Sequence, residues 1–243
     1  MGLNVSPRKI IVGWMRVRHT NREYAIVCLS GGQDSATCLA WAKEKFKKIF
    51  SVCFIYGQRH IIEVECAKKL SELAGCVKHF EIKIDQLFSQ ITESNLIKNQ
   101  GDLNRPFDLD KDLPASFVPF RNLFFISSAA SIAYIYGIKN IVVGVSQTDF
   151  SGYPDCRNTF IKSLNATLEL AVDSSFEIHT PLMYLSKKDT VLLMKELGKL
   201  DWYKYTHTCY EGVRPACGKC PACKLRLKGF KEANIKDPIE YRK

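Results

Sequence analysis

The residues that most constrain the fold are Ser-Gly-Gly-Gln-Asp-Ser at positions 30–35, which follow an apolar run at residues 24–29 and precede an amphipathic stretch opening at Ala36. The apolar run is typical of a buried parallel strand, and the stretch behind it predicts a helix. Two adjacent glycines allow a tight turn whose backbone N–H groups face one concavity, and we expect Asp34 or Ser35 to cap the helix. Such a turn, at the positive end of a helix, attracts anions and above all phosphate.

The loop is neither a Walker A motif, because no Lys-Ser or Lys-Thr pair closes it, nor a dinucleotide fingerprint, because its glycine spacing differs. The pattern Ser-Gly-Gly-x-Asp-Ser resembles the pyrophosphate-binding loop of ATP enzymes that adenylate a carboxylate or carbonyl. The alternative is a tight turn that binds no ligand. Candidate ATP-binding residues are the loop and the first helical turns: Leu29, Ser30, Gly31, Gly32, Gln33, Asp34, Ser35, Ala36, Thr37, Cys38 and Leu39.

Strand-like and helix-like segments alternate along the chain. Further strands are predicted at residues 49–56, 77–84, 141–145 and 176–179, and further helices at 61–74, 123–136, 155–172 and 186–197. This alternation predicts an α/β fold with a twisted parallel sheet, helices on both faces and right-handed crossovers. Ligands of such sheets bind at the carboxyl ends of the strands, where the loop at 30–35 lies.

The 243 residues, 46% of them hydrophobic, fit one domain, which we place at residues 23–243. Residues 1–22 form a basic extension with five Lys and Arg and no acid, and we expect it to be disordered or a transit peptide. The polar segment 89–119, rich in Asp, Gly and Pro, predicts a mobile lid or a disordered loop.

The net charge is +10, but half of it lies in the basic extension, so nucleic acid is a weaker candidate partner than a small anion. No apolar run is long enough to span a membrane, and we expect a soluble protein. Ten cysteines scattered through buried-looking segments, without a signal peptide, favour a reducing, cytoplasmic location.

Four cysteines near the C-terminus have the spacing of metal ligands: Cys209, Cys217, Cys220 and Cys223. Two-residue gaps let successive thiolates converge on one ion, and four sulfurs complete a tetrahedral site with no open position. We therefore predict a structural zinc knuckle at 209–223, which would pin the C-terminal segment onto the domain. An iron–sulfur centre and a redox pair are the alternatives.

Polar residues at predicted strand ends and helix starts form a candidate substrate site. Arg121 opens the helix at 123–136, where the helix dipole would not favour a cation, so an anionic ligand or an ion pair with an aspartate of the polar segment is expected. The turn after the fourth strand holds Asp149, Tyr153, Asp155 and Arg157, which could bind a guanine-like base. The alternative is an ordinary Gly-Pro turn that binds no ligand. Lys187 starts the last predicted helix and would face the phosphates, or solvent.

Taken in order, these residues resemble the 7-cyano-7-deazaguanine synthase family. The resemblance runs over residues 24–241 and lies in SGGQDS, YGQRH, VPxRN, DFSGYPDCR, PLMYLSK and the four-cysteine knuckle followed by Arg226 and Gly229-Phe230. It implies a Rossmann-like fold of the adenine nucleotide alpha hydrolase type and an ATP-dependent ligase that converts 7-carboxy-7-deazaguanine and ammonia, through an amide, to the nitrile. It also implies bound zinc, magnesium with ATP, and often a homodimer.

With this resemblance, Asp34, Ser35, Arg121 and Lys187 are the candidate catalytic residues. The substrate candidates are Arg121, Asp149, Tyr153, Asp155 and Arg157. The family form has Gly where this chain has Phe120, so we expect the backbone to turn differently there or Phe120 to line the pocket. The rival functions are a tRNA-modifying enzyme with the same loop, an enzyme that attaches a deazaguanine to a macromolecule in a defence or DNA-modification pathway, and a non-enzymatic zinc module.

Overall fold

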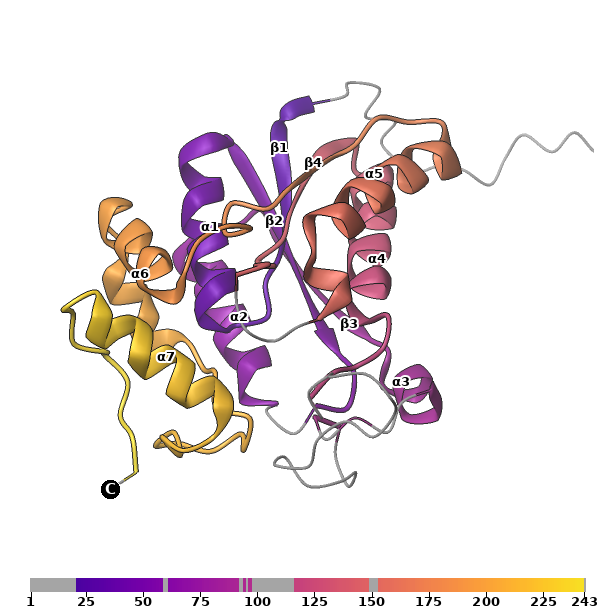
Figure 1. The fold of residues 1–243 in the computed structure, drawn as a ribbon. Coiled ribbons are helices and arrows are strands. Elements are labelled where there is room, and N and C mark those ends of the chain that lie inside the picture. The colour runs from indigo at the N-terminus through magenta and orange to yellow at the C-terminus, as the bar shows by residue number, and fades with distance from the viewer. Residues whose placement is uncertain are drawn as a thin grey trace, which may run out of the picture.

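A computed structural model describes residues 21–58, 61–91, 94, 96–97, 116–148 and 153–242 (Figure 1). Within them, five parallel strands form one sheet in the order β3-β2-β1-β4-β5. The strands are β1 Asn21–Cys28, β2 Lys48–Ile55, β3 Lys78–Lys83, β4 Ile138–Val142 and β5 Glu177–His179. The predicted parallel α/β sheet is therefore confirmed, and each strand lies within three residues of the predicted position.

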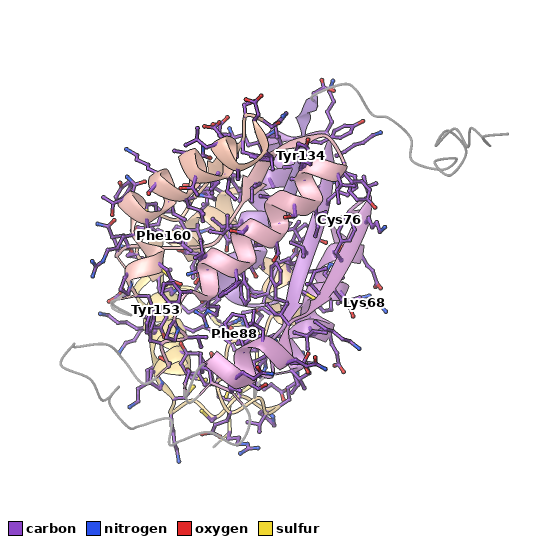
Figure 2. The ribbon with its side chains drawn as sticks, turned by 90° about the vertical axis from the view of Figure 1, so that its right-hand side faces the viewer. Lys68, Cys76, Phe88, Tyr134, Tyr153 and Phe160 are labelled. Carbon is purple, nitrogen blue, oxygen red and sulfur yellow. The ribbon has the colours of Figure 1, made fainter. Side chains whose placement is uncertain are left out.

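Helices cover both faces of the sheet, as predicted (Figure 1). They are α1 Gln33–Lys45, α2 Ile62–Leu73, α3 Asp85–Ile91, α4 Arg121–Ile135, α5 Asn158–Val172, α6 Lys187–Glu196 and α7 Pro221–Glu232, with 3-10 turns η1 Pro154–Cys156 and η2 Leu200–Tyr205. Side chains of β1 alternate between the two cores: Ile26 packs on the α4 side, and Ala25 and Val27 pack on the α1 side. Figure 2 shows α4 and α5 side by side across the first of these faces.

The order of the strands places the loop after β1 at the topological switch point. The chain runs from β1 to β2 and β3 on one side, then returns to β4 and β5 on the other side of β1. The carboxyl ends of β1 and β4 therefore border the crevice in which such sheets bind ligands. Gly144, just after β4, packs closely under the loop, since a Cβ there would lie 3.2 Å from the carbonyl carbon of Asp34.

Two parts of the chain differ from the sequence-based prediction. The helix expected over 155–172 is broken, because residues 154–156 form η1 and α5 begins only at Asn158. Helices α3 and α7 and the turn η2 were not predicted. The basic extension up to residue 20 and most of the polar segment 89–119 lie outside the described residues, although α3 extends into the start of that segment. Among the helices that the structure describes, none is long and apolar enough to cross a bilayer.

Candidate active site

The loop after β1 has the conformation of an anion-binding turn. Gly31 has φ +88°, and a Cβ there would lie 2.1 Å from the carbonyl oxygen of Glu63, so only glycine fits between the loop and the start of α2. The N-cap of α1 is Gly32, which provides no side-chain cap, so the first N–H groups of this helix remain available to a ligand.

The predicted cap by Asp34 or Ser35 is wrong, because both residues lie within the first turn of α1. The Ser35 hydroxyl lies 3.0 Å from that of Ser30 and donates to the Gly32 carbonyl at 3.1 Å. The Gly32 N–H donates to the Ser30 hydroxyl. These hydrogen bonds connect residues of the turn to one another, and none of them caps the N-terminus of α1.

Lys187, at the start of α6, reaches the loop. Its Nζ lies 2.6 Å from the Asp34 Oδ2, while the Oδ1 of Asp34 has no hydrogen-bond partner among the described residues. A capping box between Ser186 and Asp189 fixes the start of α6. Gly229 of α7 lets α7 pack closely on the start of α6, since a Cβ at Gly229 would lie 2.6 Å from the Lys187 Cβ.

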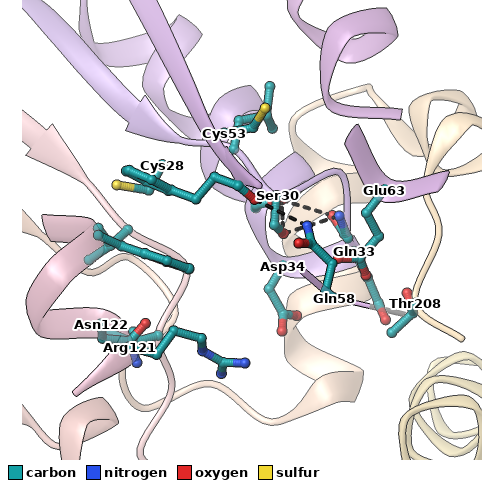
Figure 3. A pocket seen from close by; sticks show the side chains of 18 of the residues that line it. Cys28, Ser30, Gln33, Asp34, Cys53, Gln58, Glu63, Arg121, Asn122 and Thr208 are labelled. Atoms are coloured by element: carbon teal, nitrogen blue, oxygen red, sulfur yellow. Dashed lines mark hydrogen bonds between the residues drawn. The ribbon is translucent and has the colours of Figure 1, made fainter. Parts of the chain in front are cut away.

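A cavity of about 300 Å³ opens at the carboxyl edge of the sheet (Figure 3). One side is the loop, with Leu29, Ser30, Gly32, Gln33, Asp34 and Ser35, joined by Lys187. The opposite side carries Arg121, Asn122 and Tyr153, and apolar side chains such as Val52, Phe54 and Val143 line the sheet between them. A cavity of this volume fits a small-molecule ligand of nucleotide size.

The guanidinium of Arg121 lies among aromatic rings in this cavity. Its carbon is 5.7 Å from the centroid of the Tyr153 ring. Burial raises the pKa of the Tyr56 hydroxyl, and the charge of this guanidinium acts in the opposite direction. Burial alone would lower the pKa of Arg121, but the neighbouring oxygen atoms, those of Tyr56 and Tyr153 first, raise the pKa above its ordinary value. Within the described part of the chain, no carboxylate forms an ion pair with this cation. The predicted alternative, an aspartate of the polar segment, lies outside those residues.

The structure separates the other substrate candidates. Tyr153 lines the cavity. Asp155 is buried, and its Oδ2 accepts the backbone N–H of Asn122 at 3.0 Å, so this carboxylate satisfies the N-terminus of α4. Arg157 is exposed and is not among the residues that line the cavity. Asp149 lies outside the described residues.

Several residues that line the cavity are not among the site residues predicted from the sequence. Tyr56 directly follows β2 and opens the stretch YGQRH, so it had a positional signal and belongs to the resemblance. Thr208 and Tyr210 flank Cys209, and Arg226 lies in α7, so these three reach the cavity only through the folding of the C-terminal segment. No local pattern around them predicts a ligand site.

The expectation that the backbone turns differently at Phe120, or that Phe120 lines the pocket, is wrong. Phe120 takes the left-handed conformation that glycine would favour, with φ +60° as the N-cap of α4, and its side chain is 63% exposed. It is not among the residues that line the cavity. The backbone therefore turns as a glycine would allow, at the cost of strain in a bulky residue.

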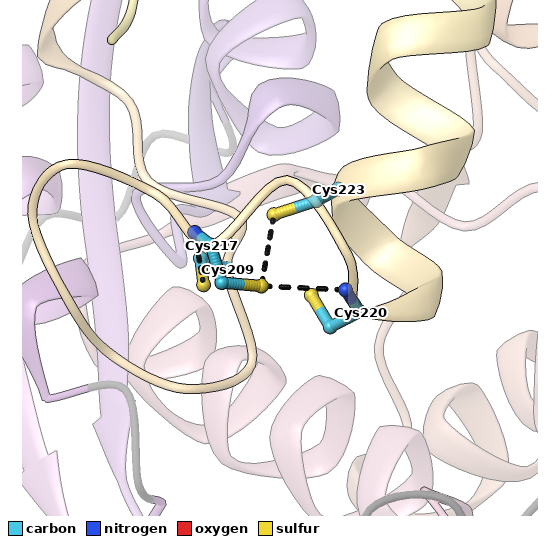
Figure 4. Close-up of side chains that lie close together, drawn as sticks. All are labelled: Cys209, Cys217, Cys220 and Cys223. Carbon is cyan, nitrogen blue, oxygen red and sulfur yellow. Dashed lines mark hydrogen bonds between the residues drawn. The ribbon is translucent and has the colours of Figure 1, made fainter. Parts of the chain in front are cut away.

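The four C-terminal cysteines converge as a buried cluster (Figure 4). Their Sγ atoms all lie within 4.8 Å of one another. The backbone N–H groups of Lys219 and Cys220 donate to the Cys217 sulfur at 3.4 and 3.3 Å. Hydrogen bonds from the Cys220 and Cys223 thiols lower the pKa of Cys209. Four converging sulfurs with N–H donors fit a tetrahedral metal ion.

Comparisons with known proteins agree over most of the chain. The family model of queuosine biosynthesis protein QueC matches residues 24–234. A 7-cyano-7-deazaguanine synthase of Chromobacterium violaceum is 46% identical over 226 residues, which are 90% of this chain and 94% of that protein. A protein of the same name from Bacteroides fragilis is 51% identical over 212 residues, 86% of this chain and 94% of that protein. Among solved structures, a 4-thiouridine synthetase–RNA complex with bound ATP aligns with TM-score 0.49 and 17% identity, over 87% of this chain and 50% of that one.

Proposed function

The chain belongs to the QueC family of queuosine biosynthesis proteins, and from this premise we propose that it converts 7-carboxy-7-deazaguanine and ammonia to 7-cyano-7-deazaguanine with ATP. A carboxylate is a poor electrophile because oxide would have to leave. Adenylation turns that oxygen into part of AMP, which ammonia can displace to give the amide. A second adenylation, on the amide oxygen, again releases pyrophosphate; the oxygen then leaves with AMP while the amide nitrogen loses its two protons, which gives the nitrile.

The observation that carries this proposal is the single cavity shared by the loop and Arg121. The uncapped N–H groups of α1, with Ser30, Ser35 and Lys187, would hold the ATP phosphates and neutralise the charge that develops on them. Asp34, whose Oδ1 has no hydrogen-bond partner among the described residues, is the carboxylate suited to hold a magnesium ion that accompanies ATP. Of the predicted stretch Leu29 to Leu39, the residues that line the cavity are the candidates for contact with the phosphates, whereas the buried residues 36–39 do not line it and would support the helix from behind.

Arg121 would bind the carboxylate of the acid. Its guanidinium faces the cavity without an ion-pair partner in the described part of the chain, and the ring of Tyr153 beside it offers a face for the planar base. Asp149 stays a candidate for the base edge. Asp155 and Arg157 are weaker candidates, because the first is engaged with α4 and the second lies away from the cavity.

Zinc at Cys209, Cys217, Cys220 and Cys223 would have a structural role. Four thiolates leave no open coordination position, so the ion would stabilise the C-terminal fold and take no part in the reaction. We further propose one domain at residues 23–243, a cytoplasmic enzyme and a homodimer. The ten cysteines, none of which forms a disulfide in the structure, support the location, and the family resemblance supports the dimer.

The test is incubation of the purified protein with ATP, magnesium, ammonium and 7-carboxy-7-deazaguanine, with mass spectrometry of the products. Two AMP per nitrile are expected. Absence of AMP above background would refute the assignment. The nitrile as a free small molecule is also expected, whereas a labelled deazaguanine retained on tRNA or on a protein would favour the attachment reaction instead.

A further inference from the structure

Beside Gly32, at the N-terminus of α1, oxygen atoms of three residues border a small space. Apart from its chain neighbours, a Cβ placed on Gly32 would lie nearest to the Ser30 Oγ at 3.4 Å, the His207 carbonyl oxygen at 3.6 Å and the Glu63 Oε1 at 3.9 Å. Among the described residues, therefore, no atom fills the place of that methyl group. The carbonyl oxygen and the carboxylate only accept hydrogen bonds, and the carboxylate charge would repel a phosphate. The space suits a small group with several N–H donors.

Two polar side chains of the cavity belong to this region. Glu63, in the first turn of α2, is half-buried and lines the cavity; within the described residues, the only other carboxylate in the lining is Asp34, which is ion-paired. Gln33 is only 2% exposed and also lines the cavity, yet neither its Oε1 nor its Nε2 has a hydrogen-bond partner among the described residues. Figure 3 shows both side chains on the side of the cavity opposite Arg121. A buried amide that the fold leaves unpaired indicates a ligand.

We propose that Glu63, Gln33 and the space beside Gly32 form the subsite of the reacting nitrogen, which is ammonia in the first half of the reaction and the amide nitrogen in the second. This inference rests on the proposed function, which places the acid at Arg121 and the phosphates at the loop, and it gives the third reactant a site. The nitrogen must meet a carbon that is joined through oxygen to the phosphorus held at the N-terminus of α1. The subsite lies at that end of the helix.

Glu63 is also the acceptor of the protons that this nitrogen loses. When the lone pair of ammonia forms the C–N bond and the C–O bond to AMP breaks, the nitrogen carries three hydrogens and a positive charge, and one proton goes to the carboxylate. In the second half, the nitrogen loses one proton when the amide oxygen attacks the α-phosphorus and pyrophosphate leaves. It loses the other when the C–O bond to AMP breaks and the nitrile forms. Because Glu63 is half-buried, it can pass each proton to water between the steps.

The test measures Glu63→Gln in two reactions. Without ammonia, acid-dependent exchange of labelled pyrophosphate into ATP reports adenylation alone, and its rate should stay within about threefold of wild type. With ammonium present, formation of amide from the acid, and of nitrile from the isolated amide, should fall about 100-fold or more, because both steps lose their general base. Glu65→Gln, at an exposed position of the same helix that does not line the cavity, is the matched control and should retain wild-type rates.

Two further variants test the space itself. Gly32 has φ −81° and ψ 172°, an extended conformation open to alanine, so Gly32→Ala places a methyl group among the three oxygen atoms without forcing the backbone. Gln33→Met keeps the length of the side chain and removes both polar atoms. In each variant the KM for ammonium should rise about tenfold more than the KM for ATP, the effect of losing one hydrogen bond to the nitrogen.

The outcomes separate this inference from the proposed function. If Glu63→Gln loses pyrophosphate exchange and amide formation equally, or if added magnesium restores its turnover, Glu63 serves ATP or its metal and the inference is overturned. Undiminished amide formation in Glu63→Gln, or KM values for ammonium that rise no more than those for ATP in both other variants, would overturn it as well. In these cases nitrile formation by wild type leaves the proposed function standing. Should Glu63→Gln fail to fold, the Gly32 and Gln33 variants decide. If wild type shows neither acid-dependent exchange nor nitrile, both fail.

Discussion

The Nζ of Lys187 lies 2.6 Å from the Oδ2 of Asp34, although 153 positions separate the two residues in the chain. The contact joins the start of α6 to the first turn of α1, beside the phosphate loop. The carboxylate thereby holds the ammonium group in the cavity at the place where phosphate charge is expected.

Replacing Lys187 should abolish most turnover without unfolding the protein. Lys187→Met keeps the aliphatic part of the side chain but removes the charge, and kcat/KM should fall by about 100-fold or more. Asp34→Ala should abolish turnover too, with the fold intact by circular dichroism. Lys188→Met, at the exposed neighbouring position, is the control and should retain wild-type kinetics. Full activity of Lys187→Met would exclude it from phosphate binding.

Removing one knuckle cysteine should remove the metal. Cys220→Ser leaves three thiolates, and because metal binding contributes to folding, we expect loss of bound zinc together with a lower melting temperature. Atomic emission gives the ratio of metal to protein. Cys76→Ser, a free cysteine outside the cluster, should keep that ratio unchanged. One zinc per chain in Cys220→Ser would contradict the four-sulfur site.

The buried pair of Arg226 and Asp237 should matter far more to stability than an exposed pair nearby. Arg226 donates to Asp237 at 2.8 and 2.9 Å with side chains only 1% and 5% exposed, so Asp237→Asn leaves a buried cation poorly compensated. The free energy of unfolding should fall by about 3–5 kcal/mol. Glu211→Gln, which disrupts the exposed pair with Arg242, should cost less than about 1 kcal/mol. Urea unfolding of both variants checks the difference, and equal losses would contradict it.

Because the backbone at Phe120 is strained, a glycine at this position should give a more stable protein than an alanine, which is the reverse of their usual order. Because φ is +60° and the side chain is exposed, Phe120→Gly relieves strain, whereas Phe120→Ala retains it. The glycine variant should be more stable than the alanine variant by about 1 kcal/mol. Neither should change the KM for ATP, since Phe120 does not line the cavity. A more stable alanine variant would mean that the turn is not left-handed.

Stability should fall on acidification partly through His79. Burial lowers the pKa of His79 from its ordinary value of 6.5, while its Nδ1 shares a hydrogen bond with Ser51 at 2.8 Å. Below about pH 6.5 the unfolded chain binds a proton that the folded chain binds only at lower pH, so the free energy of unfolding decreases with falling pH in that window. In His79→Gln, urea midpoints measured between about pH 8 and about pH 5.5 should fall less steeply than in wild type. An unchanged slope would show that His79 is not responsible.

Local signals in the sequence predict the parts of the site that are local in the chain. The loop at 30–35 depends on glycines and a flanking strand, and the knuckle depends on cysteine spacing, so both are visible in short windows. Lys187 could be placed because it starts the last predicted helix, directly after the fifth predicted strand. The parallel sheet was predicted because each strand-like and helix-like segment is also recognisable in a short window of sequence.

Contacts between distant segments were not predictable in this way. Asp155 was expected at the substrate because a carboxylate in this turn can accept the adjacent N–H donors of a guanine-like base, but it accepts the Asn122 N–H from another element and is buried. Tyr210 and Arg226 show no pattern that distinguishes a cavity residue from a core residue. Helix α7 was missed because it begins inside the cysteine pattern, at Pro221, where the sequence suggested only a metal loop.

The packing of α7 makes the phosphate site depend on a segment far from the phosphate loop in the chain. This helix carries Cys223 in its first turn and Gly229 against the backbone of Lys187 further along, so the cysteine cluster and the phosphate lysine share one rigid support. Without α7, the phosphate loop would remain but the lysine that faces it would lose the surface against which it packs. We therefore expect a truncated chain ending before Pro221 to be unable to consume ATP.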